Sequence, residues 1–169
     1  RAAEMASILG DPSLSVYYNE RAAAYRLAVN TYCWDDKQKA YVDTVRDEYA
    51  YARYLAYMEE RHMSALSYED YKKRARISVQ TNTMALLYDC VPESKKEKAL
   101  RFLIDNIKSG LYVSGTPANR TTGKPSDEEA PDGYVHIGSP FFLYFALQTL
   151  YKFGYDDLAI LSQKRDWGN

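Results

Sequence analysis

The feature that most constrains this fold is a pair of helices predicted toward the carboxyl end of the chain. Residues 141–151 are apolar on nearly every side, and Ser139 and Pro140 precede them as an N-cap and a first-turn residue. A helix that is apolar all round is normally enclosed by other elements. Gly154, a residue type common after helix ends, separates this helix from residues 156–165, which combine an apolar stripe with a charged face. We therefore expect an inner helix followed by an outer helix, the repeating unit of a double-layered helical barrel.

A second pair of helices with the same character is predicted upstream. Residues 77–88 are mostly apolar but carry the amide side chains Gln80 and Asn82. Val91 and Pro92 then open a charged helix. Its apolar stripe consists of Leu100, Leu103, Ile104 and Ile107. Buried inner and charged outer helices thus alternate again, although the two pairs share no clear sequence repeat. The expected fold class is all-α.

Further elements are predicted on either side of these pairs. A short helix at the amino end precedes a longer one that Asp11 and Pro12 open. The apolar positions of this longer helix are Leu14, Tyr18, Ala22, Tyr25, Val29 and Tyr32. Residues 34–43 indicate a turn and a short extended piece, and residues 46–75, rich in charge and tyrosine, indicate two more helices. Residues 109–137 read as a long loop, and such loops in compact domains are usually functional or mobile.

Composition and charge exclude several classes of protein. With 169 residues and 46% apolar content, the chain can bury one sizeable core. The net charge is −1 with both signs interleaved, so we expect no binding of nucleic acid and no attraction to an anionic membrane. The longest apolar run, residues 141–147, is too short to span a bilayer. Both ends of the sequence fall in or directly beside predicted helices, so we expect a piece of a larger protein.

No cofactor or metal site is indicated by the sequence. Cys33 and Cys90 lack the paired spacing of a zinc site, and we expect two core thiols, with a disulfide as the alternative. A Ser-His-Asp pattern, a phosphate-binding loop and a dinucleotide fingerprint are all missing. We therefore expect neither a cofactor nor a metal.

Several short segments occur in an order that resembles one family of enzymes. They are Trp34-Asp-Asp, Ala40-Tyr-Val-Asp43, Gln80-x-Asn82-x-x-Ala85, Val91-Pro92, Gly138-Ser-Pro140, Gly154-Tyr-Asp-Asp and Trp167-Gly168. Together they resemble the helical-barrel catalytic domain of the alpha-L-rhamnosidases, glycoside hydrolase family 78. The resemblance implies an (α/α)6 toroid of six hairpins, with residues 1–169 as part of one domain and a sugar pocket among the inner-helix ends and loops. Related six-hairpin enzymes, including glucoamylases and unsaturated glucuronyl hydrolases, share this architecture.

The resemblance also implies hydrolysis of terminal alpha-L-rhamnosides with inversion. Such a mechanism uses an acid and a base whose carboxyl groups stand roughly 6.5–9.5 Å apart. The family carries its acid in an Arg-Glu segment upstream of the matched part and its base after a downstream Trp-Glu segment, and neither segment is present here. The main catalytic carboxylates are therefore expected outside this chain, and the isolated chain is expected to be inactive. The implied partners are a rhamnose-containing carbohydrate and the rest of the same catalytic domain.

This chain departs from the family pattern at two places. Residues 46–75 look like an insertion between the segment that ends at Asp43 and the helix that carries Gln80. Residues 117–132 lengthen the loop that precedes Gly138. This loop contains Glu128, Glu129 and Asp132, which are the candidates for an acid and a base within this chain. A solvated acidic loop is the alternative interpretation of this cluster.

Four residues are candidates for contacts with a sugar, namely His136, Gln80, Asn82 and Trp34. An imidazole can hydrogen-bond sugar hydroxyls, buried amides need polar partners, and an indole ring can stack on a sugar. Each candidate also has a structural alternative. Loop backbone can satisfy the histidine, neighbouring loops can satisfy the amides, and the tryptophan can close a corner of the core.

A function of a different class remains as the alternative to an enzyme. A non-catalytic helical module would bind carbohydrate, or would dock a protein partner through the tyrosines of residues 46–75. Inner helices without their neighbours would expose apolar flanks. We therefore expect the isolated chain to self-associate or to be only marginally stable.

Overall fold

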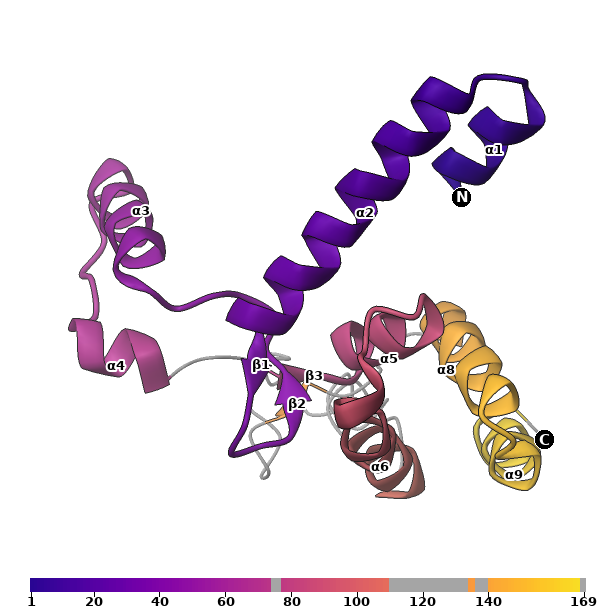
Figure 1. Ribbon diagram of the computed structural model, residues 1–169. Helices are drawn as coiled ribbons and strands as arrows, with labels where there is room; N and C mark the ends of the chain where they lie inside the picture. Colours follow the sequence, from indigo (N-terminus) through magenta and orange to yellow (C-terminus); the bar gives the residue numbers. More distant parts are fainter. Residues whose placement is uncertain (74–76, 110–133, 136–139, 168–169) are drawn as a thin grey trace.

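Helices form most of the described structure, which confirms the expected all-α class. The computed structural model describes residues 1–73, 77–109, 134–135 and 140–167 (Figure 1). Its helices are α1 (Ala2–Ile8), α2 (Pro12–Tyr32), α3 (Glu48–Glu60), α4 (Tyr68–Lys73), α5 (Val79–Leu87), α6 (Glu93–Ser109), α8 (Pro140–Lys152) and α9 (Asp156–Trp167). The strands are β1 (Trp34–Asp35), β2 (Ala40–Tyr41), β3 (Ile77–Ser78) and β4 (Tyr134–Val135).

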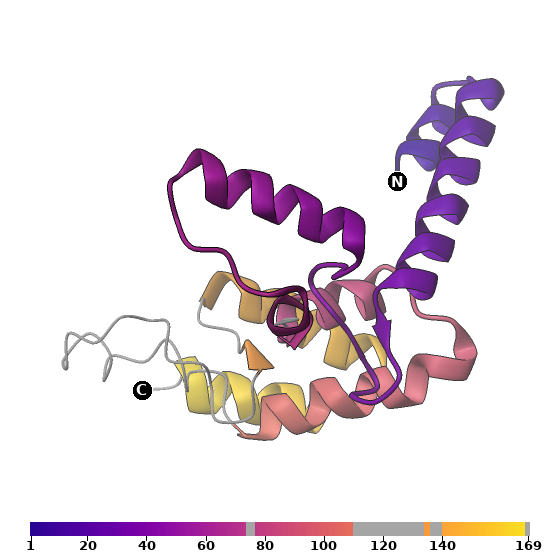
Figure 2. The same ribbon diagram turned by 90° about the vertical axis from the view of Figure 1, so that its left-hand side faces the viewer.

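The core lies between two helical hairpins, α5 with α6 and α8 with α9. Helix α5 packs beside α8, and each is backed by the helix that follows it in the chain. In Figure 2, α6 and α9 run back along α5 and α8 in the opposite direction. Fully buried side chains from three of these helices meet in the core, among them Leu86, Leu103, Ile107, Leu143 and Leu150. The predicted pairing of an inner helix with an outer helix is therefore present twice.

A short parallel pairing of strands joins the starts of the two hairpins. Strand β3 leads directly into α5, and β4 pairs with it in the register Ile77 to Tyr134 and Ser78 to Val135. Helices α5 and α8 run in the same direction, away from this pairing (Figure 2). The inner helices therefore present their amino ends on the same side of the molecule.

Glycine ends α8 as the sequence predicts. Gly154 has a φ of 76°, in the left-handed region that side chains rarely occupy. The Tyr155 N–H donates to the Leu150 carbonyl at 2.9 Å, and the Gly154 N–H donates to the Tyr151 carbonyl at 3.1 Å. These bonds satisfy the last carbonyls of the helix in a Schellman motif. The chain can thus reverse within three residues and start α9.

One prediction about α8 is wrong, because the helix is not enclosed on all sides. Leu143, Ala146, Leu147 and Leu150 are buried, as expected for an inner helix. The opposite flank is open, with Phe141 75%, Tyr144 52% and Tyr151 44% exposed. No other element of the described residues packs over this flank. An apolar sequence shows that a helix tends to be covered, but it cannot show that the covering element is present.

The first two helices form a hairpin that projects from the body (Figure 1). Helix α2 carries the predicted apolar positions, but none of its residues is fully buried, and Tyr25 and Tyr32 are 60% and 65% exposed. Its carboxyl end is fixed through Asn30, which donates to the Cys90 carbonyl at 2.7 Å and accepts from the Tyr41 hydroxyl at 2.6 Å. In the described part of the chain, no helix has both the length and the hydrophobicity needed to cross a bilayer.

Residues 46–75 contain the two predicted helices, α3 and α4. Among the described elements, these helices pack against each other and against no other helix or strand. Their contact is built on tyrosine rings, with Tyr51 and Tyr71 centred 5.2 Å apart and Tyr54 and Tyr71 4.9 Å apart. The Tyr51 hydroxyl donates to the Leu66 carbonyl at 2.7 Å. The segment is therefore a small unit with its own aromatic core.

Candidate functional site

A fixed carboxylate lies at the amino end of α5. Asp43 follows β2, and its Oδ1 accepts from the hydroxyl groups of Ser78 and Thr81, each at 2.6 Å. The Ser78 backbone N–H donates to the same oxygen at 3.2 Å. Ser78 also caps α5, because its Oγ accepts from the Thr81 N–H at 3.0 Å. The other oxygen, Oδ2, makes no hydrogen bond to a described residue, and the Asp43 side chain is exposed.

A cavity of about 430 Å³ is lined in part by Thr81, the residue whose hydroxyl donates to Asp43. We call it the α5 cavity. Helix α5 and its C-cap contribute Gln80, Thr81, Met84 and Tyr88 to its walls, while Val29 and Tyr41 close it from the side of α2 and β2. Most of this lining is apolar, with the Gln80 amide and the Thr81 hydroxyl as polar groups. A small ligand with both apolar and hydroxyl surfaces matches such a lining.

Tyr41 forms the buried floor of the α5 cavity. Burial of its ring raises the pKa of its hydroxyl to about 12. The hydroxyl therefore stays protonated at neutral pH and donates to Asn30 at 2.6 Å. Cys33 and Cys90 are both free thiols, as expected, and burial raises the pKa of the Cys33 thiol. Cys33 is thus not poised as a thiolate nucleophile.

Asn82 serves the fold, although it is only two residues from Gln80. Its side chain is fully buried, its Oδ1 accepts from the Tyr41 N–H at 2.8 Å, and its Nδ2 donates to the carbonyls of Tyr41 and Ser78. The amide bonds the N–H and the carbonyl of Tyr41, as the backbone of a paired strand would, and so connects β2 to α5. These contacts support the structural alternative for Asn82 and leave no polar atom facing a ligand.

Trp34 is held within the body of the protein. Its ring packs edge-on against Tyr41 at 5.0 Å, and the Lys95 ammonium lies 4.9 Å from the ring centroid. The indole nitrogen faces Asp36 at 3.4 Å. With one ring face occupied by a cation, the contacts support a packing role over a stacking platform for sugar.

The remaining candidates lie outside the described residues. These are His136, Glu128, Glu129 and Asp132. Val135, which precedes His136 in the chain, pairs with Ser78 at the start of α5.

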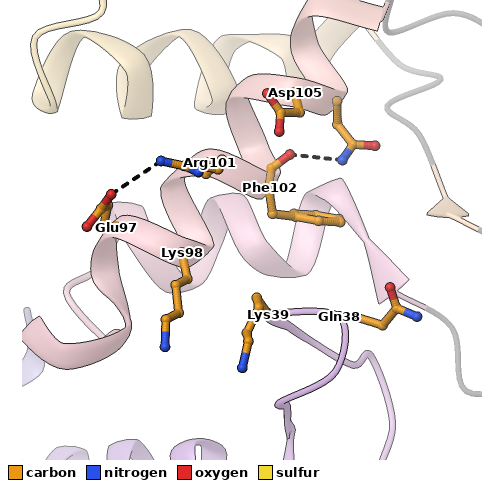
Figure 3. A pocket seen from close by; sticks show the side chains of 8 residues that line it. Gln38, Lys39, Glu97, Lys98, Arg101, Phe102 and Asp105 are labelled. Carbon is orange, nitrogen blue, oxygen red and sulfur yellow. Dashed lines mark hydrogen bonds and ion pairs between the residues drawn. The ribbon is translucent and has the colours of Figure 1, made fainter.

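A second cavity, of about 490 Å³, lies between the turn of the β1–β2 hairpin and α6 (Figure 3). We call it the turn cavity. The hairpin turn contributes Gln38 and Lys39, and α6 contributes Glu97, Lys98, Arg101 and Asp105. Phe102 anchors the turn to α6, because its buried ring packs with Ala40 and Ile77. No local sequence pattern indicates this cavity, because its two walls are about sixty positions apart in the chain.

The described residues hold no group of histidine, cysteine and carboxylate side chains that could bind a metal ion. The sequence matches no protein-family model, no curated protein and no solved structure.

Proposed function

We propose that this chain forms part of the (α/α)6 barrel of an inverting glycoside hydrolase acting on terminal alpha-L-rhamnosides. The observation that carries the proposal is the arrangement of α5 and α8. They lie side by side, start at the same end, and are each backed by an outer helix, α6 or α9. This is the arrangement that two successive hairpins of such a barrel require.

Exposed apolar side chains on the outer flanks of α5 and α8 support the proposal that the chain belongs to a larger barrel. On one side, α8 exposes Phe141, Tyr144 and Tyr151. On the other side, α5 borders the α5 cavity with Met84 and the half-exposed Tyr88. Large exposed apolar surfaces usually mark contacts with another protein surface. Further inner helices on both flanks would cover them, with the main catalytic carboxylates carried by those hairpins.

The amino ends of the inner helices are the proposed side for the sugar. Asp43 supplies an exposed carboxylate whose orientation Ser78 and Thr81 fix through hydrogen bonds. Its Oδ2 is available to accept from a sugar hydroxyl. We assign Asp43 to substrate binding. An acid–base role would require a second carboxylate across the sugar, and none is described nearby.

Sugar binding by Asp43 is testable with L-rhamnose. The polypeptide in which this chain occurs is expected to bind L-rhamnose, and Asp43→Asn should weaken binding by about tenfold, the usual effect of losing one charge-assisted hydrogen bond. Asp47→Asn is the matched control, because Asp47 caps α3 away from this site. Isothermal titration calorimetry gives both values. Equal affinity in the two variants would contradict the assignment of Asp43.

A second candidate function, a non-catalytic module that docks a protein partner, is favoured by one observation. The α3–α4 unit has its own aromatic core and exposes Tyr49 and Tyr57 to 73% and 49%. Exposed tyrosines are enriched in protein interfaces. A complex with a partner protein that Tyr49→Ser and Tyr57→Ser together abolish, without any effect of L-rhamnose, would favour this second function.

A further inference from the structure

The α3–α4 unit is attached to the body at the proposed sugar side of the molecule. It occupies the chain between Asp43 and Ser78, and these two residues are bonded to each other, with the Ser78 hydroxyl 2.6 Å from Asp43 Oδ1. The unit therefore leaves the body and returns to it at the same place, the amino end of α5. Figure 1 shows α3 and α4 on the side from which β3 enters α5. A ligand that Asp43 binds would thus lie near both ends of the unit.

Helix α3 directs its tyrosines to two different sides. Tyr51 and Tyr54 pack against Tyr71 of α4 and form the core of the unit. Tyr49 and Tyr57 lie on another side of the helix and are 73% and 49% exposed. Among the described elements, only α4 packs against α3. The two exposed tyrosines are therefore not needed to hold the unit together.

Arg53 lies between Tyr49 and Tyr57 on the exposed side of α3. The three residues follow one another at intervals of four positions, so they form one row along the helix, with about 12 Å between the first and the last. We call this row the α3 stripe. The other neighbours of Arg53 one turn away are Ala50 and Ala56, whose small side chains leave the guanidinium accessible. Arg53 makes no hydrogen bond or ion pair with a described residue.

The charge along the α3 stripe is positive. One turn beyond Tyr57 lies Arg61, whose guanidinium is 4.4 Å from the centroid of the Tyr57 ring. The acidic residues of α3, each at least five positions from Arg53, are Glu48, Glu59 and Glu60. Aromatic rings and an accessible guanidinium therefore alternate on this side of the helix. Such a surface favours a ligand that combines an apolar face with a negative charge.

We propose that the α3 stripe binds an acidic saccharide, with sugar rings on Tyr49 and Tyr57 and a carboxylate on Arg53. A pyranose ring presents a face of C–H groups that can pack on a tyrosine ring, and the tyrosine hydroxyl can bond the sugar hydroxyls. The guanidinium can hold a carboxylate through two parallel hydrogen bonds. The unit would thereby add binding positions for an acidic chain that carries the rhamnose at Asp43.

The small size of the α3 stripe favours a saccharide over a protein. A strip about 12 Å long on a helix about 10 Å wide is far smaller than the roughly 800 Å² that each partner buries in a stable protein complex. Its position at the amino end of α5 also fits an extended sugar chain. The choice of a saccharide rests on the proposed function, whereas the charge of the ligand follows from Arg53.

The test is a calorimetric titration of the polypeptide in which this chain occurs with the trisaccharide of D-galacturonate, with maltotriose as the neutral probe. The acidic trisaccharide is expected to bind about tenfold more tightly than maltotriose. Arg53→Gln should weaken its binding by about tenfold, the usual effect of losing one charge-assisted contact, and Tyr49→Ala should weaken it as well. Both side chains are exposed, so both variants should melt as the parent does.

Helix α2 supplies a matched control, because Tyr17, Arg21 and Tyr25 repeat the same spacing. There the arginine is already engaged, since it donates to the Tyr25 hydroxyl at 2.7 Å, and the helix projects from the body (Figure 1). Arg21→Gln should therefore bind the acidic trisaccharide as the parent does. Equal losses in Arg21→Gln and Arg53→Gln would mean that any exposed arginine attracts the probe, and would overturn the site.

The other outcomes separate the α3 stripe from the proposed function. Full binding of the acidic trisaccharide by Arg53→Gln, or equal binding of maltotriose by the parent, would overturn the stripe. A protein complex that Arg53→Gln abolishes, with no binding of the trisaccharide, would replace the saccharide with a protein partner. Binding of L-rhamnose without binding of the trisaccharide would overturn the stripe alone. Trisaccharide binding that depends on Arg53, without binding or hydrolysis of any rhamnoside, would support the stripe and overturn the proposed function alone.

Discussion

At the scale of single residues, Asn82 is the polar group on which the core depends most. It is fully buried, and its amide makes three hydrogen bonds to the backbone of Tyr41 and Ser78. Removing such a group leaves a buried N–H and two buried carbonyls with fewer partners, which costs more than the net value of the bonds. The amide therefore positions β2, and with it Asp43, against the start of α5.

Substitution of Asn82 by alanine should lower the free energy of unfolding by about 2–4 kcal/mol, since it strips a buried network and leaves a cavity. The exposed Asn19 on α2 offers the matched control, and Asn19→Ala should change stability by less than about 0.5 kcal/mol. Urea unfolding followed by circular dichroism measures both. A loss for Asn82→Ala no larger than that of the control would show that the amide does not hold the core.

Tyr41 makes stability depend on alkaline pH. Its pKa is about 12 in the folded protein because the ring is buried, whereas the unfolded chain titrates near its ordinary value of 10. The unfolded state therefore loses its proton first as the pH rises. The stability contributed by the protonated hydroxyl is complete below pH 10 and is lost as the pH rises from 10 toward 12.

Tyr41→Phe is expected to remove this part of the pH dependence. The variant should be less stable than the parent at pH 8, because it loses the hydrogen bond to Asn30. The difference between the two should shrink above pH 10. Urea midpoints for both proteins at pH 8, 9.5, 10.5 and 11.5 test this. A constant difference across the series would mean that the hydroxyl titrates normally in the folded state.

At the scale of elements, α8 has an open apolar flank, and so does the α1–α2 hairpin. Phe141, Tyr144 and Tyr151 lie along one side of the helix and are between 44% and 75% exposed. Exposed apolar surface of this kind usually marks a contact with another protein surface, and further barrel hairpins would cover it. Without those hairpins, a second copy of the chain can cover this flank by forming a dimer.

The 169-residue chain alone should therefore form dimers or larger species at micromolar concentration, as measured by size-exclusion chromatography with light scattering. A triple variant, Phe141→Ser, Tyr144→Ser and Tyr151→Ser, should be more monomeric because it removes apolar surface from the open flank. The matched control is Tyr49→Ser with Tyr57→Ser on α3. If the control variant dissociates and the α8 variant does not, the cover lies on the α3–α4 unit instead.

The hairpins α5–α6 and α8–α9 could be predicted because the spacing of their apolar residues and the capping residues at their ends indicate the same helices. The stripe of α6 illustrates this, since Leu103, Ile104 and Ile107 are buried as expected. The enclosure of α8 could not be predicted, because apolar residues do not reveal whether a neighbour is present. On α9 the buried stripe also differs, with Ser162 buried and Leu161 63% exposed.

The candidate site was predictable only in part. Gln80 and Asn82 belong to one sequence motif, yet two residues along a helix point to nearly opposite sides. Gln80 therefore borders the α5 cavity, whereas Asn82 is buried in the core. The hydrogen bonds that Asp43 accepts from Ser78 and Thr81 join segments separated by the α3–α4 unit. No local pattern contains such a long-range contact.

At the scale of the whole molecule, the described helices account for two hairpins of the proposed barrel, with a polar end around Asp43 and a projecting α1–α2 hairpin (Figure 1). A closed ring would place further inner helices against the flanks of α5 and α8. It would also bring the two missing carboxylates to the side on which these helices begin. The proposed chemistry then follows from an acid and a base separated by roughly 6.5–9.5 Å across the sugar.

Hydrolysis of 4-nitrophenyl alpha-L-rhamnoside by the polypeptide in which this chain occurs tests the central claim most directly. Proton NMR during the reaction identifies the first anomer released. The proposal predicts that nitrophenol appears and that beta-L-rhamnose forms first, because water attacks the face opposite the leaving group. A folded protein that releases no rhamnose, or one that releases the alpha anomer first, would contradict it.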